Sequence, residues 1–266
     1  MKSVFVFCPA FGHQISSGTV ISICELMQAF YIRGIGGGFS TLSFPDIAEL
    51  RSMAMTIWYD TLKDSDYLLY IDADMGFKPE LVLDYLAFDE PVVGCLYPKK
   101  ILPISYVGSS TGEITAQTRG YFIEVGGVGF GVTMIRRDAV TAIIEKFPEI
   151  IDDRLKMHVA ADLLKGSGTN RIIRAFDKIE DPKEGWLSED LSFCRRWREC
   201  GGKVWAAVGH TVSHIGLFPF TGKYLDVMNR VPDEVQPLGN ATMTAESPAA
   251  ALPVIEPEPA ILEAAE

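Results

Sequence analysis

Two carboxylates at the end of an apolar run are the residues of this chain best placed to do chemistry. The run Tyr67–Ile71 is uninterrupted, which is typical of a strand buried on both faces of a parallel sheet. Asp72 and Asp74 follow it directly, at the edge where open α/β sheets bind ligands. Two hard oxygen ligands there could hold a divalent cation and, through it, a substrate diphosphate. The same residues could instead only end the strand and cap the next helix, since Asp is common in both roles.

A second group of polar side chains precedes a helical pattern late in the chain. Glu189 and Asp190 stand in its expected first turn, shortly after Trp186. A helix N-terminus stabilises negative charge, and an ionised carboxylate suits a general base. The two acids could also serve the helix alone, with Ser188 as its cap. Trp186 could belong to the core.

Two histidines, His210 and His214, follow a short strand pattern. Imidazole nitrogen is a common metal ligand in proteins. A histidine at the end of a strand can equally be an ordinary surface or core residue.

Alternating strand and helix patterns predict the elements that position these residues. In the first half we expect strands over 3–8, 39–44, 67–71 and 91–96, with helices over 19–33, over 46–62 and from 79. In the second half we expect extended ribbon over 99–133, helices over 137–147 and 188–200, and a strand over 203–207; residues 151–164 are compatible with a further helix. This order predicts an α/β fold with a mainly parallel sheet covered by helices on both faces.

Composition predicts one folded domain over residues 1–231 and a disordered tail over 232–266. The tail has seven acidic residues and no Lys or Arg, with few large apolar side chains to pack. The other 231 residues therefore carry −4 of the net charge of −11. No broad basic surface for nucleic acid is indicated.

The compartment predicted from the sequence is the cytoplasm. The five cysteines are scattered without a Cys-x-x-Cys pair, which indicates reduced thiols. The apolar start of the chain is short and is interrupted by Pro9, so we interpret it as the first strand and not as a signal peptide. No segment approaches the roughly 18 apolar residues that a membrane span requires.

The order and spacing of these motifs resemble those of glycosyltransferases of the GT-A fold. The likeness is closest to the small family-2-like enzymes of bacteriophages and large DNA viruses, and it spans about residues 3–225. The segments 94–100, 125–130 and 189–196 and the pair Arg136-Arg137 contribute to it. The resemblance implies a single GT-A (Rossmann-like) domain. It also implies a metal-dependent, hexosyltransferase-type enzyme that moves a sugar from a UDP- or GDP-linked donor to a hydroxyl acceptor.

The resemblance also implies roles for individual residues. Asp74 would bind the metal, which is Mn²⁺ or alternatively Mg²⁺, and Asp72 would contact the ribose or a metal-bound water. His214 would complete the coordination, with His210 as the rival ligand. Asp190 would be the general base of an inverting reaction, with Glu189 as its neighbour in the motif.

Further positions carried over from the family concern the donor and the acceptor. For the nucleotide-sugar they are Pro9, Phe11, His13, Arg51, Asp72, Ala73 and Lys223, with Lys99 and Lys100 as further candidates near phosphate or acceptor. For the acceptor they are Trp186, Gly127 and Gly129. The acceptor class stays open among a glycan, a lipid-linked saccharide, a protein and a modified DNA base.

Two other functions are compatible with parts of the pattern. Haloacid-dehalogenase-type phosphohydrolases also place Asp-x-Asp at a strand end, with the first acid, here Asp72, as nucleophile. They usually continue with Thr or Val, whereas this chain has Met75-Gly76, and a later acidic pair is missing. A non-catalytic sugar-binding protein is the other alternative.

Overall fold

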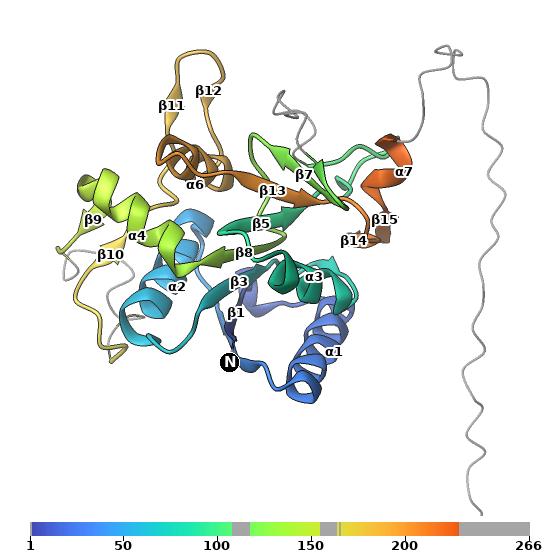
Figure 1. Cartoon of the computed structure of the whole chain (residues 1–266), viewed down its shortest axis with the longest axis horizontal. Coiled ribbons are helices and arrows are strands. Elements are labelled where there is room, and N and C mark those ends of the chain that lie inside the picture. The colour runs from blue at the N-terminus through green and yellow to red at the C-terminus, as the bar shows by residue number, and fades with distance from the viewer. Residues whose placement is uncertain (1, 108–117, 155–163, 165, 229–266) are drawn as a thin grey trace, which may run out of the picture. The chain divides into compact units, whose positions relative to one another are not determined.

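The protein is built around an eight-stranded sheet (Figure 1). The computed structural model describes residues 2–107, 118–154, 164 and 166–228. In their order across the sheet, the strands are β2 (Gly36–Leu42), β1 (Ser3–Pro9), β3 (Tyr67–Ile71), β8 (Val132–Arg136), β5 (Val92–Cys95), β13 (Val204–Ala207), β7 (Phe122–Val125) and β6 (Thr118–Arg119). Six of these eight strands run in one direction, and β7 and β8 run in the other. The α/β class and the mainly parallel sheet are thus confirmed.

Helices cover both faces of the sheet, as Figure 1 shows. One face packs against α1 (Ser17–Arg33) and α3 (Glu80–Phe88), and the other against α2 (Ile47–Thr61), α4 (Arg137–Lys146) and α6 (Glu189–Glu199). Strand β3 is fully buried and serves both cores, since Leu68 and Tyr70 face one and Leu69 and Ile71 the other. This alternation is the physical reason for its unbroken apolar sequence.

The smaller elements lie around this frame. They are η1 (Phe11–His13), β4 (Met75–Gly76), η2 (Pro148–Ile150), β9 (Ile151–Asp152), β10 (Ile172–Ile173), β11 (Glu180–Asp181), β12 (Gly185–Trp186), β14 (Val212–Ile215), β15 (Pro219–Gly222) and α7 (Tyr224–Met228). Strands β15, β14 and β4 form a separate three-stranded sheet. Among the described residues, no helix has the length and apolar character needed to cross a membrane.

Two features differ from the sequence prediction. The strand expected over 39–44 begins earlier, because the preceding glycines belong to β2, and a Cβ atom at Gly37 would lie 3.1 Å from both Met27 and Phe30. Their missing side chains thus let α1 pack directly on this strand. In addition, β8 inserts between β3 and β5 and pairs antiparallel with both, which the alternating pattern did not indicate.

Three expectations fall wholly or partly on residues outside the described part. Of the extended ribbon expected over 99–133, residues 108–117 lie outside it. Within the helix expected over 151–164, the structure has strand β9 at Ile151–Asp152, and 155–163 lie outside the described residues. The expected tail, 232–266, also lies outside them. The division into a domain and a tail therefore stays a prediction.

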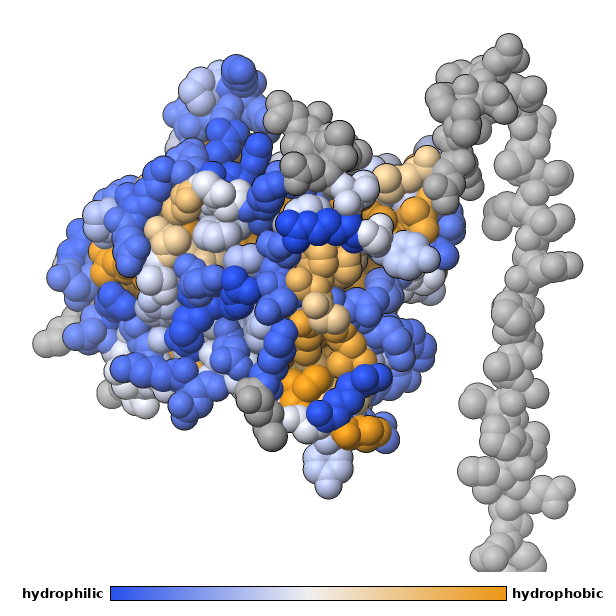
Figure 2. Space-filling view, viewed as in Figure 1, coloured by the Kyte–Doolittle hydropathy of each residue, from blue (hydrophilic) through white to orange (hydrophobic). Residues whose placement is uncertain are grey.

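Figure 2 shows one face of the molecule, and on it hydrophobic side chains gather where α1 and α3 lie in Figure 1. Helix α1 contributes exposed apolar residues on its outer side, among them Ile21 at 58% and Ile32 at 73% of full exposure. This surface is separate from the polar residues discussed below.

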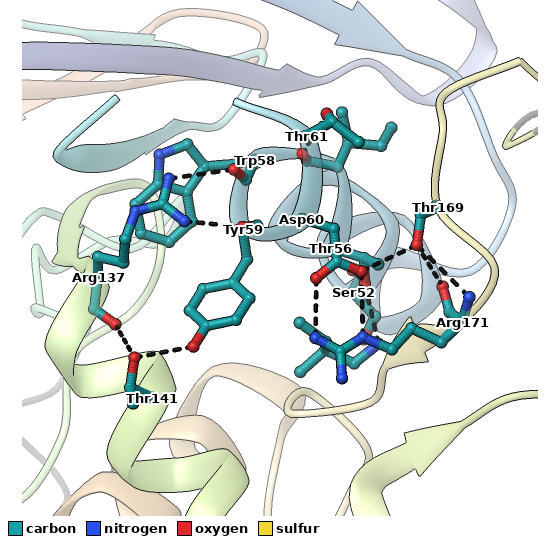
Figure 3. A network of polar contacts seen from close by, with 12 residues as sticks. Ser52, Thr56, Trp58, Tyr59, Asp60, Thr61, Arg137, Thr141, Thr169 and Arg171 are labelled. Carbon is teal, nitrogen blue, oxygen red and sulfur yellow. Dashed lines mark hydrogen bonds and ion pairs between the residues drawn. The ribbon is translucent and has the colours of Figure 1, made fainter. Parts of the chain in front are cut away.

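The C-terminal end of α2 is held by two arginines from other elements (Figure 3). Arg137 donates to the carbonyl groups of Tyr59 at 2.8 Å and Leu62 at 2.8 Å, and its guanidinium lies 4.4 Å from the ring centroid of Trp58. Arg171 makes a two-pronged contact with Asp60, at 2.8 and 3.1 Å. Carbonyl groups at a helix end need such donors, so these contacts fix the helix that carries Arg51.

Replacing Arg137 with Met should lower the free energy of unfolding by about 1–3 kcal/mol, because partly buried carbonyl groups lose their donors. Arg154→Met is the control. The Arg154 side chain is 71% exposed and pairs with Asp152 at 3.0 Å, so its loss should lower the free energy of unfolding much less than the loss of Arg137. Denaturant unfolding followed by circular dichroism measures both changes. Equal losses in the two variants would contradict this role of Arg137.

Candidate functional site

A cavity of about 670 Å³ lies where β1 and β3 end. Its polar lining consists mainly of Arg51, Asp72, Asp74, Glu189 and His214, with Ala73 between the two aspartates. These residues come from α2, the segment after β3, the start of α6 and strand β14. Their separation in the sequence is large, and the fold brings them together at one sheet edge. A cavity of this volume is in the range that accommodates a small ligand or cofactor.

Short backbone pairings determine which histidine reaches this cavity. Strand β14 pairs with β4 so that His214 lies opposite Met75, and the amide of Ile215 donates to the carbonyl of Asp74 at 2.7 Å. The imidazole of His214 is thereby placed beside the Asp74 carboxylate. His210 lies elsewhere, with its Nε2 2.8 Å from Asp84 on helix α3.

The orientation of His214 leaves one ring nitrogen facing Asp74. Its Nδ1 donates a 3.0 Å hydrogen bond to the carbonyl of Pro98, since a carbonyl oxygen can only accept. Its Nε2 lies 3.5 Å from Asp74 Oδ2. Between these two atoms fits either a proton on Nε2, which is donated to the carboxylate, or a metal ion that accepts a lone pair from each atom. This donor set therefore fits a divalent metal.

Asp74 also contacts a lysine. Lys100 Nζ donates to the same oxygen, Asp74 Oδ2, at 2.5 Å. Burial opposes ionisation of Asp74, but His214 and Lys100 outweigh it and hold the pKa of this carboxyl below its usual value. Nearby Cys8 is excluded as a thiolate ligand, because burial, aided by the two aspartates, raises its pKa to about 12.

Asp72 has a different environment from Asp74. Arg51, which is 3% exposed, donates to Asp72 Oδ1 at 2.8 Å and to Glu189 Oε1 at 2.6 Å. Burial raises the pKa of Asp72 above its usual value, and the charge of Arg51 offsets this only in part. Burial alone would lower the pKa of Arg51, but the surrounding carboxylates raise it. Arg51 was expected at the nucleotide; it also joins α2, β3 and α6 through two buried ion pairs.

Replacing Arg51 with Met should lower the free energy of unfolding by about 3–5 kcal/mol, because it leaves two partly buried carboxylates without their cation. Lys78→Met is a control for losing a cation at the surface. The Lys78 side chain is 74% exposed and lies 3.1 Å from Glu25, so its loss should cost less than about 1 kcal/mol. Thermal and urea unfolding of both variants would test this. A mild effect at Arg51 would show that the ion pairs do not stabilise the fold.

The first turn of α6 separates the two acids of the Glu-Asp motif. Glu189 lines the cavity and is held by Arg51. Asp190 accepts hydrogen bonds from the hydroxyl of Ser188 and from the amide of Leu191, the latter at 2.8 Å. Ser188 makes no side-chain cap on the helix, so its hydroxyl serves Asp190 instead of the backbone.

The predicted donor and acceptor residues divide into two groups. Pro9, Phe11 and Ala73 line the cavity. His13, Lys223 and Trp186 are not part of the lining. His13 is exposed, and Trp186 on β12 is 68% exposed. Lys223 lies 3.8 Å from Asp226.

Gly127 and Gly129 are buried, and their neighbours account for the absence of side chains. A Cβ atom at Gly127 would lie 2.7 Å from a methyl group of Leu191, and one at Gly129 would collide with the hydroxyl of Tyr97. Close packing therefore explains both glycines at least as well as an approach to an acceptor.

Several lining residues were missed by the sequence analysis. Phe44 and Pro45 follow β2 and lie at the same sheet edge as Pro9, so the position after the second strand was a usable signal. Tyr97 packs its ring edge-on against His214, with centroids 5.4 Å apart. No local pattern distinguishes Tyr97 from other buried aromatic residues.

A larger cavity, of about 940 Å³, lies between the β11–β12 hairpin and α6. Oppositely charged side chains pair across it, such as Arg195 with Asp181 at 2.6 Å and Lys203 with Glu124 at 2.9 Å. These pairs satisfy one another, whereas the donor atoms of Asp74 and His214 converge on one point. The smaller cavity is therefore the better candidate for chemistry.

No family model matches the chain, and no curated protein matches it. Among solved structures, A197 from STIV aligns over 81% of this chain and 86% of its own, with 18% identity and a TM-score of 0.46. The catalytic domain of Drosophila beta1,4-galactosyltransferase 7, in complex with xylobiose, aligns over 54% and 52%, with 13% identity and a TM-score of 0.33. A glycosyltransferase involved in glycosylation of the major capsid of PBCV-1 aligns over 55% and 64%, with 12% identity and a TM-score of 0.32. Because these TM-scores are below 0.5, the function has to be argued from the geometry of this chain's own site.

Proposed function

We propose that this protein is a GT-A-type glycosyltransferase that moves a sugar from a nucleotide-sugar to a hydroxyl acceptor with the help of a divalent cation. The observation that carries the proposal is the convergence of Asp74 and His214 in a cavity at the end of β3. Their donor atoms are 3.5 Å apart, and the cavity of about 670 Å³ suits a small-molecule ligand such as a nucleotide-sugar.

Asp74 and His214 are the residues that would hold the cation, and Mn²⁺ suits this pair of oxygen and nitrogen ligands better than Mg²⁺. Two protein ligands leave further coordination positions for phosphate oxygens. A bound cation would stabilise the negative charge that develops on the leaving nucleoside diphosphate. UDP- and GDP-sugars are the donors that we propose.

The remaining residues orient the reactants. Asp72 is held by Arg51 at 2.8 Å and lines the cavity, where it would contact a ribose or a metal-bound water. Pro9, which ends β1, and Phe11, which begins η1, are proposed to contact the nucleoside. Trp186 is proposed as an acceptor platform, which its exposure of 68% on a hairpin supports.

Asp190 is the proposed general base. It would take the proton of the acceptor hydroxyl as the oxygen attacks the anomeric carbon and the bond to the diphosphate breaks. Glu189 instead forms an ion pair with Arg51 at 2.6 Å, which supports a structural role for it. Attack opposite to the leaving group gives an inverted product.

The phosphohydrolase alternative is less well supported. It requires Asp72 as a free nucleophile, whereas Arg51 occupies its Oδ1 atom and burial raises its pKa. A buried carboxylate engaged in this way is a poor nucleophile.

Calorimetric titration with a panel of UDP-, GDP-, dTDP- and CMP-sugars, with and without Mn²⁺, tests the proposed function. We expect one donor to bind tightly only when Mn²⁺ is present. His214→Ala should weaken Mn²⁺-dependent binding at least about tenfold, because a metal ligand is lost. His210→Ala is the matched control and should bind as the wild type does, because His210 pairs with Asp84 away from the cavity.

Equal losses in the two histidine variants would count against His214 as a ligand. Failure of every donor to bind, with or without Mn²⁺, would contradict the glycosyltransferase proposal and favour a different class of protein. Hydrolysis of a phosphate ester by the same preparation would support the phosphohydrolase alternative.

Asp190→Asn should lower kcat by about 10²–10⁴-fold and leave donor affinity unchanged, because only the proton acceptor is lost. Glu189→Gln is the comparison. It weakens the Arg51 contact, so it should lower the free energy of unfolding, and its kcat should fall less than that of Asp190→Asn. Turnover of the donor found by calorimetry, with the acceptor that it requires, measures the first effect. Intact turnover in Asp190→Asn would show that another group takes the proton.

A further inference from the structure

Two basic side chains approach the same oxygen of Asp74 from different elements. Lys100 Nζ lies 2.5 Å from Oδ2, and His214 Nε2 lies 3.5 Å from it. An ammonium group and a metal ion that share one carboxylate oxygen repel each other, so each weakens the binding of the other. At Asp74 Oδ2, Lys100 and a divalent cation therefore compete.

We propose that Lys100 competes with the divalent cation for Asp74 and is transferred to the diphosphate of the donor when the metal binds. This inference rests on the proposed function. Asp74 exchanges the Lys100 ammonium group for the metal ion, and Lys100 exchanges the Asp74 carboxylate for the diphosphate. Charge remains balanced in both arrangements.

The backbone around Lys100 limits where its ammonium group can go. The preceding residue, Lys99, donates to the carbonyl of Ser105 at 2.6 Å, and Pro98 pairs with Tyr106 in an isolated bridge. Lys100 thus extends from a tied loop, and its side chain is only 36% exposed. A released ammonium group stays near the mouth of the cavity, where the phosphate oxygens of a bound donor would be.

The consequence is positive coupling between metal and nucleotide. Metal that binds alone must break the ion pair of Lys100 and leave the ammonium group without an anion. Metal that binds together with a nucleoside diphosphate gives the ammonium group a new partner. By linkage, each ligand then strengthens the binding of the other, and removal of Lys100 weakens this coupling.

The test compares Mn²⁺ binding to the wild type, Lys100→Met and Lys99→Met, with no donor present. Electron paramagnetic resonance of free Mn²⁺ measures each affinity directly. We expect Lys100→Met to bind Mn²⁺ about five- to tenfold more tightly than the wild type, in the range of ordinary coupling between ligands. Lys99→Met removes the same charge one residue away and should match the wild type.

The same titration with UDP, or with GDP if the donor panel selects guanine, measures the coupling. The nucleotide should raise the Mn²⁺ affinity of the wild type by a larger factor than that of Lys100→Met. Unchanged Mn²⁺ affinity in Lys100→Met would overturn the competition while leaving the metal site intact. Absence of Mn²⁺ binding in all three proteins, with and without nucleotide, would instead overturn the proposed function and this inference together.

A second measurement uses the wild-type protein and needs no variant to fold. Limited acetylation with mass spectrometry reports how readily each lysine reacts. Mn²⁺ should increase the reactivity of Lys100, because its ion pair with Asp74 is broken, and should leave Lys78 unchanged. Equal reactivity of Lys100 with and without Mn²⁺ would overturn the proposal.

Discussion

The ion pairs of Arg51 are the interaction on which the rest of the site depends. One buried guanidinium joins Asp72, at the end of β3, to Glu189, at the start of α6, with distances of 2.8 and 2.6 Å. Helix α2 carries this arginine and is itself fixed at its other end by Arg137. The positions of Asp72 and Glu189 in the cavity therefore depend on how α2 and α6 pack against the same face of the sheet.

The two aspartates of one short motif have opposite electrostatic environments. Burial raises the pKa of Asp72 and Arg51 only partly offsets it, whereas His214 and Lys100 lower the pKa of Asp74 despite burial. The turn after β3 causes this difference, since the amide of Met75 bonds back to the carbonyl of Asp72 at 3.2 Å. One carboxylate is thus held in place by the fold, and the other is available to a mobile cation.

Strong local signals made part of this structure predictable from the sequence. Unbroken apolar residues identified β3, and the helical pattern over 188–200 identified α6, so Asp72, Asp74 and Glu189 were placed correctly on their elements. The pairing that brings His214 to Asp74 depends on β4, which has two residues and no detectable periodicity. The antiparallel insertion of β8 and the two partners of Arg51 arise from tertiary packing, which local sequence patterns do not encode.

The central claim is that Asp74 and His214 bind a divalent cation together. Anomalous diffraction at the manganese edge, from crystals grown with Mn²⁺ and the nucleoside diphosphate that binds, tests this claim most directly. The account predicts one peak at bonding distance from both Asp74 Oδ2 and His214 Nε2. A peak at His210 and Asp84, or none in a crystal that contains the nucleotide, would contradict it.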